Sequence, residues 1–65
     1  MKKFEITYHL TGNITLERIV NADSLEDAKK YIDNGVWIGF IDEYKHYHQF
    51  HGRNIVLGTI IELKN

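Results

Sequence analysis

Residues 3–20 read "KFEITYHLTGNITLERIV", and their pattern predicts two antiparallel strands joined by a tight turn. Apolar and polar residues alternate strictly in the first strand, which is typical of a strand with one buried face. A two-residue turn would place Tyr8 opposite Glu17, so we favour a three-residue turn with Gly12 or Asn13 at positive φ. That register pairs apolar residues with apolar residues: Leu10 with Ile14, Tyr8 with Leu16 and Phe4 with Val20.

The same register assigns the remaining side chains of the second strand to faces. Arg18 falls on the core side, at its margin, and Ile19 falls on the outer face.

A helix is predicted within "NADSLEDAKKYIDNG", residues 21–35. Asp23 or Ser24 can serve as the N-cap, acidic residues follow in the first turn, and Gly35 ends the pattern. The apolar positions form one stripe, so this helix should lie on a sheet. The stripe consists of Leu25, Ala28 and Ile32, flanked by Tyr31.

The second half of the chain predicts further strands. Residues 36–41, "VWIGFI", fit either a strand covered on both sides or a loop tucked under the core. Residues 43–50 are aromatic-rich and strand-compatible, 51–54 form a turn, and "IVLGTIIEL" at 55–63 is a strong final strand. We therefore expect one small α+β domain over residues 1–65, a four-stranded antiparallel sheet with one helix packed on one face, in the order β-β-α-β-β.

Composition narrows the possible functions. A chain of 65 residues buries a small core, and the lack of cysteine excludes disulfides, thiolate zinc sites and iron–sulfur clusters. The net charge of −1 disfavours a dedicated nucleic-acid binder. The sequence contains no stretch of about 18 apolar residues and no signal-peptide pattern, so a cytoplasmic protein is expected.

Three of the four histidines fall in "EYKHYHQFHGR", residues 43–53. In an extended strand, His46 and His48 would project from the same face and could bind one zinc or copper ion. A zinc site needs further ligands, which the fold would have to supply from His9, His51, Asp42 or Glu43. Since histidine is also common on solvated strand faces, we expect no bound metal or other cofactor.

The same stretch offers an alternative as a single-stranded nucleic-acid platform. Aromatic rings alternate there with cationic side chains, an arrangement on which bases can stack. The residues for this alternative are Lys45, Tyr47, His51 and Arg53. An enzyme is not expected, because the sequence has neither a nucleophile-elbow pattern nor a glycine-rich phosphate loop.

Surplus apolar surface favours protein binding instead. If Ile55, Leu57, Ile61 and Leu63 face the helix, other large side chains must point away from it, and such a patch usually marks an interface. The expected interface residues are Ile19, Trp37, Val56 and Ile60. The partner would be a second copy, giving a homodimer, or a host protein, unless residues 36–40 fold back over this face.

The hairpin "FEITYHLTGNITLERIV", the phrase "NADSLEDAKKYI" and the apolar last strand resemble small ββαββ proteins of unknown function from Gram-positive phages and mobile elements. Residues 36–50 depart from that pattern. The resemblance implies a non-enzymatic module that acts by binding a protein, and it implies no particular site.

Overall fold

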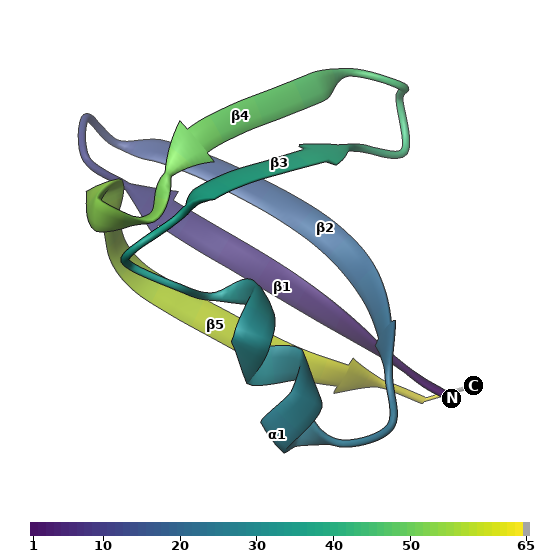
Figure 1. Cartoon of the computed structure of the whole chain (residues 1–65). Coiled ribbons are helices and arrows are strands. Elements are labelled where there is room, and N and C mark those ends of the chain that lie inside the picture. The colour runs from purple at the N-terminus through teal and green to yellow at the C-terminus, as the bar shows by residue number, and fades with distance from the viewer. Residues whose placement is uncertain (65) are drawn as a thin grey trace.

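A computed structural model describes residues 1–64 and shows a small α+β fold with two separate sheets (Figure 1). Over these residues the strands are β1 (Lys2–Leu10), β2 (Ile14–Ala22), β3 (Trp37–Ile41), β4 (Tyr47–His51) and β5 (Ile55–Leu63). The helical segments are α1 (Leu25–Ala28), η1 (Lys29–Tyr31) and η2 (Gly52–Asn54), the last two being 3-10 turns. One sheet has the order β2-β1-β5, and the other is the β3–β4 hairpin.

The predicted single four-stranded sheet covered by one helix is wrong. The β3–β4 hairpin does not extend the three-stranded sheet but lies across its inner face, beside the helical segments (Figure 1). The reason is the length of the helix: α1 spans only Leu25–Ala28, too little to cover an inner face that carries apolar residues on all three strands. Ile38, Phe40 and Phe50 of the hairpin supply the missing cover.

The first hairpin forms in the predicted register. Leu10 pairs with Ile14, Tyr8 with Leu16 and Phe4 with Val20. The sequence predicts a positive φ at Gly12 or Asn13, and in the structure both residues adopt one, at 83° and 62°.

The sequence offers Asp23 and Ser24 as N-caps, and in the structure Ser24 caps the helix. Its hydroxyl accepts a hydrogen bond from the backbone N–H of Asp27 at 3.2 Å. The helix nevertheless ends well before Gly35, and Ile32 is already extended. Two contacts with the sheet explain the early end. The Tyr31 carbonyl accepts a hydrogen bond from the Tyr8 hydroxyl at 2.8 Å, and the Ile32 side chain packs over Gly58 of β5.

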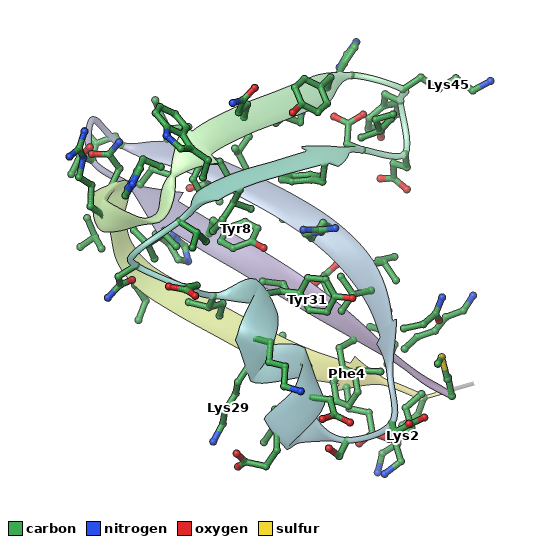
Figure 2. All side chains as sticks on the ribbon, in the orientation of Figure 1. Lys2, Phe4, Tyr8, Lys29, Tyr31 and Lys45 are labelled. Atoms are coloured by element: carbon green, nitrogen blue, oxygen red, sulfur yellow. The ribbon has the colours of Figure 1, made fainter. Side chains whose placement is uncertain are left out.

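The core lies between the inner face of the three-stranded sheet and its two covers (Figure 2). Phe4, Ile6 and Tyr8 of the central strand β1 are fully buried. The Tyr8 ring lies 4.9 Å from the Phe50 ring, which ties the hairpin to the sheet.

Arg18 projects from the inner face of β2, as the sequence register predicts. Its guanidinium group lies 4.8 Å from the centre of the Phe40 ring and 5.0 Å from that of Tyr31. A cation stacked on two rings fits the boundary between hairpin and helical segment, because Arg18 is only partly buried there.

An irregularity in β5 reverses the predicted faces of that strand. The pairing with β1 shifts between His9 and Leu10, so that Leu10 pairs with Ile55 and His9 pairs with Leu57. Val56 is therefore the extra residue of a bulge. Beyond it Ile60 pairs with the buried Ile6 and packs against the core, so its predicted outward position is wrong. Three residues expected to face the helix lie on the outer face instead: Leu57, Ile61 and Leu63.

Within residues 1–64 no helix has the length and apolar character needed to cross a membrane.

Candidate functional site

The β3–β4 hairpin has one buried face and one open face. Its inner face contributes Ile38, Phe40 and Phe50 to the core. The outer face carries three large hydrophobic side chains that are mostly exposed, Trp37 at 64%, Ile41 at 68% and Tyr47 at 62%. We call this surface the outer hairpin face; it consists of Trp37, Gly39, Ile41, Tyr47, Gln49 and His51.

Side chains on the outer hairpin face hold one another in place. The Tyr47 ring lies across Gly39 of the neighbouring strand, where a Cβ atom would come within 3.1 Å of the ring carbon Cζ. The Tyr47 hydroxyl donates to Oε1 of Gln49 at 3.3 Å. At the other end, the Trp37 and His51 rings meet edge to face with centres 5.1 Å apart. The face therefore presents ordered aromatic rings.

The turn that joins β3 to β4 is organised by Asp42. Its backbone N–H donates to the His46 carbonyl at 2.9 Å, and its carbonyl accepts the Lys45 N–H at 3.0 Å. Its Oδ1 atom accepts the backbone N–H groups of Tyr44 and His46, each at 2.9 Å. Lys45 has a φ of 67°, the left-handed conformation that closes such turns.

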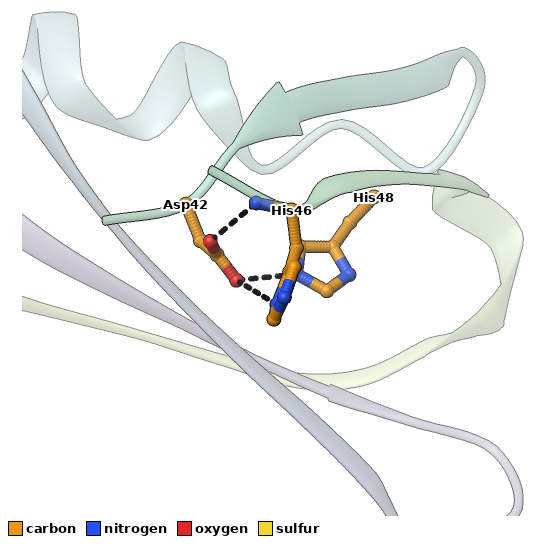
Figure 3. A group of neighbouring side chains, drawn as sticks. All are labelled: Asp42, His46 and His48. Atoms are coloured by element: carbon orange, nitrogen blue, oxygen red, sulfur yellow. Dashed lines mark hydrogen bonds and ion pairs between the residues drawn. The ribbon is translucent and has the colours of Figure 1, made fainter. Parts of the chain in front are cut away.

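Asp42, His46 and His48 form a cluster at this turn (Figure 3). The Oδ2 atom of Asp42 lies 2.8 Å from Nε2 of His48 and 3.6 Å from Nδ1 of His46. The three candidate ligand atoms all lie within 4.8 Å of one another. Hydrogen bonds from His48 and from the His46 backbone hold the pKa of the Asp42 carboxyl group below its ordinary value.

Among the predicted interface residues, Ile19 and Val56 are exposed on the three-stranded sheet, whereas Ile60 faces the core. Trp37 is exposed on the outer hairpin face. Since the hairpin packs its inner face on the inner face of the sheet, the two outer faces point away from each other. The four residues therefore do not form one patch.

The residues proposed for nucleic-acid binding are spread along the hairpin. Tyr47 and His51 lie on the outer hairpin face, Lys45 lies in the turn at one end, and Arg53 lies in η2 just after β4. The fold thus places two rings between two cations.

The sequence does not identify Ile41 as an exposed residue, because residues 36–41 fit either a strand or a loop. The alternation that would mark a strand is weak here, since the residues between and beside buried Ile38 and Phe40 carry no polar side chain that would mark an exposed face. The sequence offers Asp42 as one of several further metal ligands beside the histidines. The turn geometry brings Asp42, and not Glu43, next to them.

Comparison with known proteins gives no match: no family model fits the sequence, and no curated protein or solved structure is significantly similar to the chain. The resemblance to phage proteins therefore stays a prediction, and function has to be argued from the surfaces described above.

Proposed function

We propose that this chain is a non-enzymatic protein-binding module whose partner docks on the outer hairpin face. One observation carries the proposal: Trp37, Ile41 and Tyr47 are each more than 60% exposed on a single face of a two-stranded sheet. Large aromatic and aliphatic side chains gathered in this way are typical of the centre of a protein interface.

The outer hairpin face suits docking because core residues on the opposite side of the same strands hold its backbone in place. Its backbone belongs to strands whose opposite side chains, Phe40 and Phe50, are core residues. Its rings are constrained by neighbours, Tyr47 by Gly39 and Trp37 by His51. An ordered surface loses less conformational entropy on binding, and tryptophan and tyrosine dominate binding energy at many interfaces.

The outer face of the three-stranded sheet is a weaker candidate. Its central strand presents Lys3, Glu5, Thr7 and His9. Ile19 and Ile61 flank Glu5 directly across the sheet, so a partner that buried these isoleucines would also desolvate a carboxylate. The outer hairpin face contains no acidic or basic side chain apart from His51.

Trp37 provides a direct test, because it is the sole tryptophan and lies on the proposed surface. Binding of a protein, whether a second copy or a host protein, should shift its emission to shorter wavelength and shield it from acrylamide. If the partner is a second copy, the emission shift should grow with protein concentration. If the partner is a host protein, the shift should appear when that captured protein is added. Ile41→Asp should abolish it, whereas Val56→Asp should not. Shielding that survives Ile41→Asp, or no shielding with either kind of partner, would overturn the proposal.

A second candidate function, single-stranded nucleic-acid binding, is favoured by the placement of Tyr47 and His51 between Lys45 and Arg53. Stacking and phosphate contacts predict binding that weakens steeply with salt and is reduced by Tyr47→Ala and by Arg53→Ala. Gel shifts at low salt that show no complex at micromolar protein concentration would remove this candidate.

A further inference from the structure

We propose that Asp42, His46 and His48 bind one divalent transition-metal ion of the zinc type. The proposal is independent of partner binding, since the cluster lies at the tip of the hairpin and not on its outer face. Among residues 1–64 it is the one group of three or more histidine and carboxylate side chains whose ligand atoms converge.

The two distances from Asp42 are close to those in a metal site, and all three ligand atoms lie within 4.8 Å of one another. Zinc lies about 2.0–2.2 Å from histidine nitrogens and carboxylate oxygens, so ligand atoms in a tetrahedral site are roughly 3.3–3.6 Å apart. Asp42 Oδ2 and His46 Nδ1 are 3.6 Å apart. Asp42 Oδ2 and His48 Nε2 are hydrogen-bonded at 2.8 Å and need to separate slightly.

The hairpin turn already orients the carboxylate. Oδ1 of Asp42 accepts the backbone N–H groups of Tyr44 and His46, which directs Oδ2 toward the two imidazole rings. Hydrogen bonds of this kind commonly orient metal-binding side chains and raise their affinity. Because backbone atoms fix the carboxylate position, binding requires adjustment of the two imidazole rings only.

The three side chains of the cluster differ in their exposure to solvent. Asp42 and His48 are mostly shielded, and His48 packs against the Phe40 ring with centres 5.3 Å apart. The His46 side chain is 72% exposed, which leaves an entry route for the ion. Three protein ligands leave the fourth tetrahedral position to water or to a ligand from another molecule.

The donor set selects the class of ion. Two neutral imidazoles and one carboxylate favour zinc, copper, nickel or cobalt, whereas magnesium and calcium prefer oxygen ligands alone. Zinc is the appropriate probe because it requires no redox chemistry and accepts a tetrahedral site.

The test is isothermal titration of the purified protein with Zn²⁺, and with Mg²⁺ as a control ion. Wild type should bind one Zn²⁺ ion per chain and melt at higher temperature in its presence, while Mg²⁺ has no effect. His46→Ala should weaken Zn²⁺ binding at least 10-fold without unfolding the turn, because the hydrogen bonds at position 46 use backbone atoms.

His9→Ala is the matched control, since His9 lies on β1, outside the cluster. His9→Ala should leave the Zn²⁺ affinity unchanged. In wild type, the ring resonances of His46 and His48 should shift as Zn²⁺ is added. Absence of binding up to about 1 mM Zn²⁺ would overturn the proposal, as would equal affinity in wild type and His46→Ala, or equal loss in His9→Ala.

Discussion

Gly52 packs directly against the backbone of Asp33, and no side chain fits between them. The N–H group of Gly52 also donates to the Val36 carbonyl at 2.8 Å. This contact joins the segment that leaves η1 to the turn between β4 and β5, so it positions the hairpin over the sheet.

Gly52→Ala should therefore destabilise the fold. A Cβ atom at this position overlaps the Asp33 carbonyl, and backbone cannot move aside as a flexible side chain can. Overpacking of this kind costs about 1–3 kcal/mol of unfolding free energy. Gly35→Ala is the control, because its Cβ atom would meet only the Asp33 side chain, at 3.4 Å. Urea unfolding of both variants measures the difference, and equal stabilities would contradict the close approach.

Lys45→Gly should stabilise the hairpin. Lys45 has a φ of 67°, which costs a residue with a Cβ atom about 1–2 kcal/mol, while glycine loses about 0.5–1 kcal/mol more entropy on folding. These two terms leave a net gain of about 0–1.5 kcal/mol. Lys45→Ala keeps the unfavourable φ and should show no gain, so a thermal melt in which both variants gain equally would refute the backbone explanation.

Tyr8→Phe should alter both stability and its dependence on alkaline pH. Burial raises the pKa of the Tyr8 hydroxyl, an effect that Arg18 partly offsets. The folded state therefore disfavours ionisation, so the contribution of Tyr8 to stability is present below the unfolded pKa of about 10 and is lost as pH rises through the higher folded pKa.

At neutral pH, Tyr8→Phe should lower the unfolding free energy by about 1 kcal/mol, because the Tyr31 carbonyl loses its hydrogen bond. Above pH about 10 the variant should lose stability less steeply than wild type. Tyr44→Phe, at an exposed tyrosine, should retain the wild-type slope. Parallel pH profiles for all three proteins would show that Tyr8 ionisation is not coupled to folding.

The sequence predicts the first hairpin well because its signals are local. Alternation in β1 and the short turn allow one register that pairs apolar residues, and the structure has that register. Local sequence likewise limits the N-cap to Asp23 or Ser24, and the structure has Ser24.

Features that depend on contacts between distant segments were not predictable in the same way. The helix pattern continues to Ile32, but the hydrogen bond from Tyr8 to Tyr31 and the packing of Ile32 on Gly58 end the helix early. A shortened helix leaves room on the sheet, and the hairpin occupies it. The number of sheets therefore follows from tertiary packing, not from periodicity.

In the candidate sites too, local sequence predicts some features, and contacts between distant segments decide others. A bulge at Val56 reverses the faces of β5 beyond it. Nothing in the local sequence marks this bulge, so alternation alone places Ile60 on the wrong side. His46 and His48 were identified from their spacing, but His46 lies in the turn and not on the strand. Both imidazole rings lie near the same carboxylate oxygen of Asp42, and alternation along a strand does not predict that contact.

Site-directed photo-crosslinking in the native host tests the proposed docking surface most directly. Ile41 on the outer hairpin face and Val56 on β5 are exposed almost equally, at 68% and 70%. Each is replaced in turn by the photoreactive amino acid p-benzoylphenylalanine, and the adducts are treated with nuclease to separate protein from nucleic-acid partners. We predict a nuclease-resistant protein adduct from position 41 and none from position 56. Adducts from position 56 alone, or no protein adduct from position 41, would contradict it.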